Sequence, residues 1–436
     1  MNIRDRQILQ IALPSIVSNI TVPLLGLIDV AIVGHMGSPV YIGAVAVGSM
    51  IFNLMYWLFG FLRMGSSGLT AQALGRRDLT EVTRILVRSM AIAFGIALLM
   101  IVLQMPMKWL MFWLIGPTSD VAPFATTYFY IVIWGAPASL GLFCLSGWYI
   151  GMQNTRIPMV VSIMQNVMNI LASLTLVYGF GMKIEGVALG TVIAQYAGLL
   201  MALGGLRLYR RLYKYLVLKG TFVRKAMGRF FHVNRDIFLR TLCLVAVNLY
   251  FTSAGARHGA IILSVNTVLL QLYLFFSYFM DGFAYAGEAL GGRSYGAGNG
   301  AAFSETLRRL FGWATGVALA YTILYMVGGQ WIIGLLTDES QVLETSKEYV
   351  WWVWLVPIAS TLAFIWDGVF IGITATRGML VSSFISALLF FSVYEIVRRL
   401  LGNHALWLAM IVYLAMRGII QTIWYKKLIY NKIWIR

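Results

Sequence analysis

The clearest feature of this sequence is its shortage of charge. Only 11% of its 436 residues are charged, whereas soluble domains carry about 25%. It has two cysteines, Cys144 and Cys243, both in apolar segments, which excludes a disulfide framework and a cysteine zinc site. None of the 4 histidines stands at metal-ligand spacing from a cysteine or carboxylate, and no G-x-x-x-x-G-K-[ST] loop is present. We therefore expect no metal or cofactor, and ATP is excluded as the direct energy source.

What replaces the missing charge is a series of long apolar runs. Hydrophobic residues make up 60% of the chain, and runs of roughly 17–25 residues, enough to cross a bilayer, recur from end to end. This pattern predicts an all-α polytopic membrane protein with twelve transmembrane helices. The predicted spans are 8–33, 40–64, 81–105, 124–147, 155–179, 184–206, 235–257, 259–287, 302–326, 345–371, 378–400 and 404–428.

The basic residues are divided unequally between the two sides of the predicted membrane. One side receives most of the Lys and Arg, and the other receives only Lys108, Lys183, Arg257, Lys347, Arg398 and Arg399. Cytoplasmic loops collect positive charge, so we expect both termini in the cytoplasm and the protein in a bacterial cytoplasmic (inner) membrane. The net charge of +17 then reflects topology, and a nucleic-acid partner is not expected.

The sequence contains an internal repeat. LTAQALGRR (69–77) resembles YAGEALGGR (285–293), 216 positions later, and GWYIGMQNTRIPMVVS (147–162) resembles GVFIGITATRGMLVSS (368–383), 221 positions later. We predict two six-helix lobes, 1–206 and 235–436, with parallel topology around a central cleft. Residues 207–234 form a basic, aromatic linker that we expect to lie on anionic lipid headgroups.

One carboxylate, Asp29, stands in the apolar run TVPLLGLIDVAIVGHMG (21–37). Gly26 and Ser18 share its helical face, so this face is small and polar. Pro23 removes a backbone hydrogen bond and predicts a bend shortly before the acid. Burial disfavours the charged form of a carboxylate, which suits a group that binds and releases protons. The alternative is a structural carboxylate paired with a donor on a neighbouring helix.

The fifth predicted helix carries a polar stripe. Asn166, Asn169 and Ser173 recur at helical spacing, with Gln165 beside them. We expect the stripe to face the first helix or a central cavity, where amides can orient a carboxylate or bind a varied ligand. Interhelical hydrogen bonding is the alternative.

Further ionisable residues fall inside predicted spans, where such groups are costly and are functional candidates by default. Asp367 and Arg417 are candidate partners of Asp281, and Arg63 is another candidate. The sequence leaves these pairings open.

Glu288 lies near the cytoplasmic end of its helix. The repeat, read at the 216-residue offset, matches it to Gln72. We expect a gate or interface residue that pairs with Arg293 or Arg76.

These residues resemble the MATE (multidrug and toxic compound extrusion) transporters, specifically the DinF-like branch. The resemblance implies two six-helix lobes around a cleft that opens alternately to each side, and cation-coupled efflux of amphipathic, often cationic, organic compounds. It also implies that Asp29 is the protonation site and that the first helix bends at Pro23. The matching stretches are 13–48, 61–75, NRDIFLR (234–240), DGFAYAGEALGGRSYGAGN (281–299), DGVFIGITATR (367–377) and GNHALWLA (402–409).

The chain departs from this family's pattern in the fifth helix. Many members have N-I-x-x-D there, whereas this chain keeps Asn169 but has Ser173 in place of the acid. Sodium needs several oxygen ligands, preferably charged. Asp367 matches one acid of the C-lobe cation site of some members, but the seventh helix has none. Proton coupling through Asp29 is therefore favoured over sodium.

Three other functions compete with efflux. A lipid-linked oligosaccharide flippase of the same wider superfamily would need a cationic cavity, for which only Arg63 and Arg417 are intramembrane candidates. An enzyme would need a clustered acid–base or metal site, which is not found, and paired lobes argue against a passive channel. We expect organic small-molecule substrates and a monomer.

Overall fold

The computed structural model describes residues 2–34 and 38–429, apart from the side chains of residues 22–28, 30, 39, 428 and 429. Within this part of the chain all regular structure is helical. Among the described residues, eleven helical segments are long and apolar enough to cross a membrane. The first helix, α1 (Ile3–Gly34), is 32 residues long and carries Asp29. The predicted all-α polytopic fold is confirmed.

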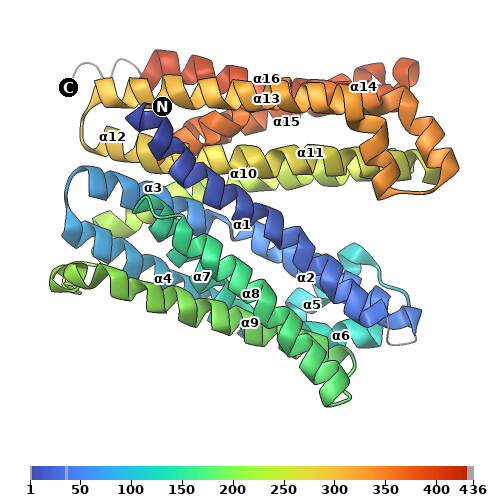
Figure 1. Cartoon of the computed structure of the whole chain (residues 1–436), viewed down its shortest axis with the longest axis horizontal. Helices are drawn as coiled ribbons and strands as arrows, with labels where there is room; N and C mark the ends of the chain where they lie inside the picture. The colour runs from blue at the N-terminus through green and yellow to red at the C-terminus, as the bar shows by residue number, and fades with distance from the viewer. Residues whose placement is uncertain (1, 35–37, 430–436) are drawn as a thin grey trace. The chain divides into compact units, whose positions relative to one another are not determined.

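The helices form two compact units. One unit is Val17–Phe230, and it holds the larger part of α1 together with the helices up to α9 (Figure 1). Its helices are α2 (Pro39–Leu58), α3 (Phe61–Gly75), α4 (Leu79–Val102), α5 (Gln104–Ile115), α6 (Ala122–Val132), η1 (Ile133–Gly135), α7 (Ala136–Gly151), α8 (Arg156–Leu174), η2 (Thr175–Gly179), α9 (Ile184–Gly205) and η3 (Leu206–Tyr215).

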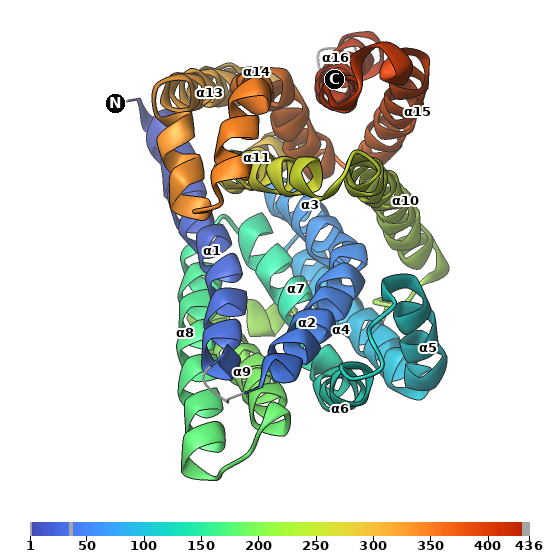
Figure 2. The same cartoon turned by 90° about the vertical axis from the view of Figure 1, so that its right-hand side faces the viewer.

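The second unit combines the chain up to Ile16 with Phe231 onward. The long helices α15 and α16 pack side by side as a hairpin in this unit (Figure 2). Its helices are α10 (Arg224–Ala256), α11 (Ala260–Ala286), η4 (Gly287–Gly291), α12 (Gly292–Gly296), α13 (Gly300–Leu336), α14 (Ser340–Gly372), α15 (Thr376–Leu401), α16 (Asn403–Trp424) and η5 (Tyr425–Ile429).

Several predicted boundaries were wrong. Residues predicted as a loop after position 105 form α5, which ends at Gly116 in a left-handed conformation. The span predicted to start at 235 starts at Arg224, so α10 takes up the end of the predicted linker. The span predicted at 302–326 extends to Leu336. Hydropathy identifies only the apolar part of a helix. It therefore misses polar residues at the ends, although these residues continue the same helical hydrogen bonding.

The internal duplication is visible in backbone contacts. In the first half, a Cβ added at Gly147 would lie 2.1 Å from the Arg63 carbonyl oxygen. In the second half, a Cβ added at Gly368 would lie 2.2 Å from the Ala284 carbonyl oxygen. Each glycine begins a G-x-x-x-G motif, completed by Gly151 or Gly372. Small residues at this spacing let two membrane helices approach backbone to backbone.

The structure corrects the offset of the first repeat pair. Asp78 caps α4 and Asn299 caps α13, each accepting a backbone hydrogen bond at 2.9 Å, and these two residues are 221 positions apart. The same offset relates the left-handed residues Arg77 and Gly298 that precede them. At this offset Glu288 matches Ser67 rather than Gln72. The 216-residue alignment followed a chance recurrence of Ala-Leu-Gly.

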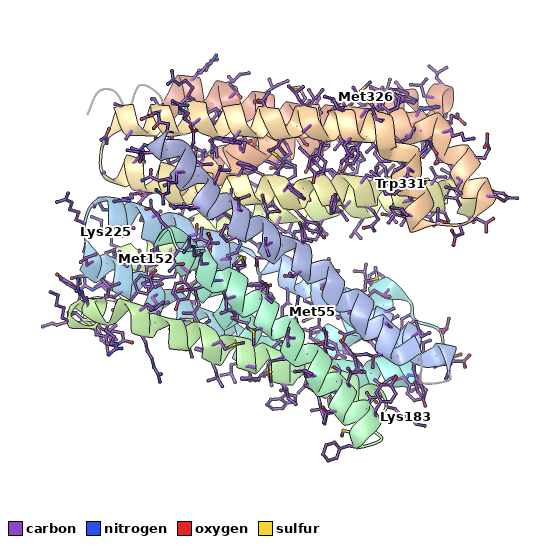
Figure 3. All side chains as sticks on the ribbon, in the orientation of Figure 1. Met55, Met152, Lys183, Lys225, Met326 and Trp331 are labelled. Carbon is purple, nitrogen blue, oxygen red and sulfur yellow. The ribbon has the colours of Figure 1, made fainter. Side chains whose placement is uncertain are left out.

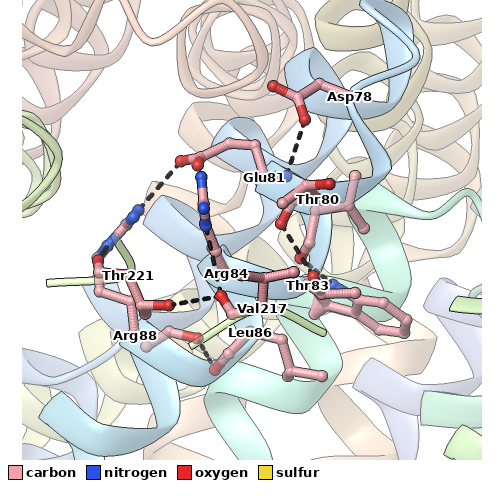
Figure 4. A network of polar contacts seen from close by, with 12 residues as sticks. Asp78, Thr80, Glu81, Thr83, Arg84, Leu86, Arg88, Val217 and Thr221 are labelled. Carbon is pink, nitrogen blue, oxygen red and sulfur yellow. Dashed lines mark hydrogen bonds and ion pairs between the residues drawn. The ribbon is translucent and has the colours of Figure 1, made fainter. Parts of the chain in front are cut away.

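Arginine side chains of α4 bind backbone carbonyl groups of the linker (Figure 4). Arg84 donates to the Lys219 carbonyl at 2.7 Å, and Arg88 donates to the Thr221 carbonyl at 2.9 Å. The repeat equivalent of Arg88 is Arg309, which pairs with Asp5 at 3.4 Å in the second unit. In each half, an arginine at the same position therefore fixes the chain near the start of the first helix of a repeat.

The outer faces of the helices are apolar. Met326 and Trp331 project from α13 with 54% and 71% of their surface exposed (Figure 3). In the first unit, Lys183 and Lys225 lie at opposite ends (Figure 3), as the predicted alternation of loops requires. Many other large apolar side chains are exposed in the same way, as expected for helices that face lipid.

We predict that Gly147→Ala and Gly368→Ala destabilise the protein. The added methyl group meets a backbone carbonyl that cannot move alone, and overpacking of this kind costs about 1–3 kcal/mol. Thermal unfolding in detergent, followed by size-exclusion chromatography with fluorescence detection, measures the effect. Gly95→Ala and Gly316→Ala are matched controls, because neither added Cβ would meet an atom within 4 Å. Equal melting temperatures for both pairs would contradict the prediction.

Candidate functional site

Asp29 is buried in the first unit. Only 4% of its surface is exposed, and its Oδ1 has no hydrogen-bond partner. It forms no ion pair with the described residues. The following turn of α1 places Ile32 and Val33 in an apolar cluster with residues of α2 and α6. The acid therefore lies in a low-dielectric setting, and none of the described residues places a cation against it.

One polar residue near Asp29, Tyr128, was not singled out from the sequence. The phenol of Tyr128 in α6 lies within electrostatic range of Asp29. Its ring packs so closely on α2 that a Cβ at Gly48 would lie 2.2 Å away. Tyr128 stands in an ordinary apolar, aromatic stretch, so only its tertiary position distinguishes it.

The polar stripe of α8 faces two helices rather than one. Asn166 donates to the Thr21 carbonyl oxygen of α1 at 2.8 Å. One turn further, Asn169 donates to Thr191 of α9 at 3.1 Å, and its own amide oxygen is buried without a partner. Ser173 lies against Gly190 of α9, where an added Cβ would be 2.2 Å from its Oγ. Of these three residues only Asn166 contacts α1, as predicted, whereas Asn169 and Ser173 contact α9.

The remaining first-unit candidates are placed as follows. Gln165 packs on α9, with its Oε1 3.1 Å from a Cβ built at Gly198. The carbonyl oxygen of Ser18 accepts a hydrogen bond from Thr21 at 2.7 Å. Pro23 lies within α1, which is one continuous helix from Ile3 to Gly34, and the side chains of residues 22–28 lie outside the described part of the structure.

A different buried acid organises the second unit. The Asp367 carboxylate of α14 accepts from Arg417 at 2.5 Å and from Gln421 at 2.7 Å, both in α16. It also accepts from Arg240 of α10. The pairing that the sequence left open is thus Arg417 with Asp367. The two guanidinium groups compensate the charge of the Asp367 carboxylate.

Arg240 falls within the predicted span 235–257, but it was grouped with the basic residues of the preceding linker and not named as an intramembrane residue. Only 7% of its surface is exposed, and it lies well inside α10. The available signal was its place at the end of NRDIFLR, a full turn beyond Asp236 on one helical face. Predicting a short helix from position 235 concealed it.

The other charged candidates lie on different helices. Arg63 of α3 and Asp281 of α11 are half-buried, and Glu288 is 1% exposed in the π-helical turn η4. The carbonyl oxygen of Glu288 packs against Gly372, where an added Cβ would lie 2.6 Å from it. Helical turns of this kind are frequent at functional sites.

Comparison with known proteins shows which family this sequence matches. The family model described as MatE matches residues 14–175 and 237–394. The chain is 39% identical to the DNA damage-inducible protein F of Escherichia coli, over 96% of this chain and 92% of that protein. It is also 22% identical to a probable multidrug resistance protein NorM of Thermotoga maritima, over 78% of this chain and 74% of that protein.

Solved structures show the same fold. A crystal structure of MATE in the bent conformation matches with a TM-score of 0.90 and 17% identity, covering 100% of this chain and 97% of that chain. The matched family segments cover most of both halves of the chain. The protein is therefore an integral membrane transporter, not an enzyme, and it belongs to the MATE family.

Proposed function

We propose that this protein is a secondary antiporter that exports amphipathic, often cationic, organic compounds in exchange for protons. The observation that carries the proposal is the buried Asp29, whose Oδ1 has no hydrogen-bond partner and which forms no ion pair with the part of the chain that the structure describes. Such a group changes charge at little structural expense, because no ion pair has to break. Proton and substrate then favour different states of the transporter, which couples their movements.

The surroundings of Asp29 favour protons over sodium. A sodium site needs several oxygen ligands at once. Ser173 replaces the usual acid of α8, and it packs on Gly190. The other intramembrane acid with assigned partners, Asp367, is engaged by two arginines. Neither position offers a free carboxylate that would complete a sodium shell.

We infer a bacterial inner-membrane location with both termini in the cytoplasm. The basic linker supports this orientation, because it exposes Tyr213, Leu218 and Phe222 among its arginines and lysines. A surface of this composition binds anionic lipid headgroups. The duplicated lobes provide a complete transporter in one chain, which fits a monomer.

A lipid-linked oligosaccharide flippase remains the second candidate. Arg240 adds one intramembrane cation to Arg63 and Arg417, which favours a negatively charged substrate more than the sequence alone did. Asp367 offsets one of these charges, so the cluster suits a pyrophosphate poorly. Movement of a lipid-linked sugar in liposomes, without transport of organic cations, would establish this alternative.

We predict that Asp29→Asn abolishes proton-driven efflux while the protein remains folded. Asparagine keeps the shape of the side chain but cannot bind and release a proton. Gradient-dependent export of a fluorescent organic cation should fall at least about tenfold, since the coupled ion no longer distinguishes the two states. Asp120→Asn, at an exposed loop position, is the matched control and should transport normally. Full activity of the Asp29 variant would refute the role of this acid.

We predict that a proton gradient alone, imposed across proteoliposomes, drives substrate movement and that a sodium gradient alone does not. Proton flux, followed with an internal pH-sensitive dye, should accompany substrate flux in the wild type. It should vanish in Asp29→Asn, while substrate binding to the detergent-solubilised variant persists. Transport driven only by sodium would overturn the choice of ion but leave the antiport mechanism standing.

A further inference from the structure

The second unit contains a buried charged cluster that takes no part in the proposed proton coupling through Asp29. Arg240, Asp367 and Arg417 come from three helices, and their side chains are 9%, 8% and 5% exposed. Both arginines donate through their Nη2 atoms to the same oxygen, Asp367 Oδ2, while Gln421 donates to Oδ1. Two guanidinium groups therefore bind one carboxylate, and each of them does so through its Nη2 atom.

Other donors of this cluster are left without acceptors. The Nε atoms of Arg240 and Arg417 and the hydroxyl of Tyr413 are buried and have no hydrogen-bond partner. A buried donor without an acceptor is costly, and more so when it is charged. The guanidinium of Arg417 also stacks over the Tyr413 ring at 5.5 Å from its centroid. These groups have the chemistry that binds an oxyanion next to an aromatic body.

The duplication shows that this cluster is not required by the scaffold. At the 221-residue offset, Arg240 matches Asn19 and Asp367 matches Ser146. The first unit builds the same helix pattern with uncharged residues at these two positions. Buried ionic groups often add nothing to stability compared with apolar residues, so a cluster present in one copy only calls for a functional reason.

Directed donors, rather than net charge, distinguish the cluster. Two arginines paired with the single carboxylate of Asp367 leave one net positive charge in the cluster. A dianion would exceed the charge that the arginines have left after binding Asp367. A monoanionic group matches the single positive charge that remains.

We propose that Arg240 and Arg417 form a binding site for the monoanionic head group of an amphipathic compound, such as a carboxylate or sulfonate on an aromatic body. Asp367 holds the two guanidinium groups in position and competes with the ligand for them. The site extends the range of compounds beyond cations to anions and zwitterions. A phospholipid head group has the same chemistry, so the test must separate a free organic anion from a lipid.

The test is an equilibrium binding measurement that needs no ion gradient, so its outcome is independent of the antiport proposal. The purified full chain is placed in nanodiscs of phosphatidylcholine and titrated with dansylglycine, an anion, and with neutral dansylamide. Arg240→Gln and Arg417→Gln should each weaken dansylglycine binding about tenfold, as expected for loss of a charge-assisted hydrogen bond, and leave dansylamide binding unchanged. Asp367→Asn should strengthen dansylglycine binding severalfold, because the competing carboxylate is gone.

The Asp367 variant separates ligand binding from a structural role. A purely structural cluster would make all three variants weaken both probes alike, and that result would overturn the proposal. Arg240→Lys, which keeps the charge but not the planar fork, serves if Arg240→Gln fails to fold, and it should show an intermediate loss for the anion alone. Arg398→Gln is the matched control, since Arg398 pairs with Glu395 on an exposed face, and it should bind like the wild type.

A second set of nanodiscs containing phosphatidylglycerol identifies the occupant. If the head group of an anionic lipid fills the site, this lipid should compete with dansylglycine in the wild type, and the competition should disappear in Arg417→Gln. If the site takes free organic anions, the lipid should leave the dansylglycine affinity unchanged. Dansylglycine binding that is insensitive to both arginines in either lipid would refute the site.

Discussion

The whole structure depends on one constraint, which is that a polar group inside a membrane must find its partner within the protein. Helices meet this demand along their own backbones, and the remaining polar groups must be placed one by one. Where two helices touch backbone to backbone, as at Gly147 and Gly368, only glycine leaves enough room. Where a carboxylate is buried, its partners decide whether it is a fixed anion or a group that can take up a proton.

Asp29 and Asp367 show both outcomes in one chain. Each is almost completely buried, yet Asp367 accepts from Arg240, Arg417 and Gln421, while Asp29 Oδ1 accepts from none of the described residues. An acid held by two arginines keeps its charge, because protonation would leave both guanidinium groups uncompensated. An acid without a cation has no such restraint.

The duplicated architecture makes the difference interpretable. Caps, left-handed residues and glycine contacts recur at a constant offset in both halves, so these features belong to the scaffold. The two acids do not recur, since Asp29 matches Tyr250 and Asp367 matches Ser146. Residues that depart from the repeat are therefore better functional candidates than residues that merely lie in a membrane segment. Arg240, whose equivalent position in the first repeat is Asn19, is the clearest example.

The sequence by itself determined the helical membrane fold, the duplication and the presence of an isolated acid, Asp29, in an apolar run, because hydrophobic run length and an isolated charge are local properties of the chain. Tertiary structure alone decided which groups meet. The sequence could not reveal that Arg417 binds Asp367, that Arg240 joins them, or that Ser173 turns toward Gly190, because each contact joins helices that are far apart in the chain. It also misaligned Glu288 with Gln72, since a short run of small residues can recur by chance. Cap and glycine geometry, fixed by three-dimensional packing, does not share that ambiguity.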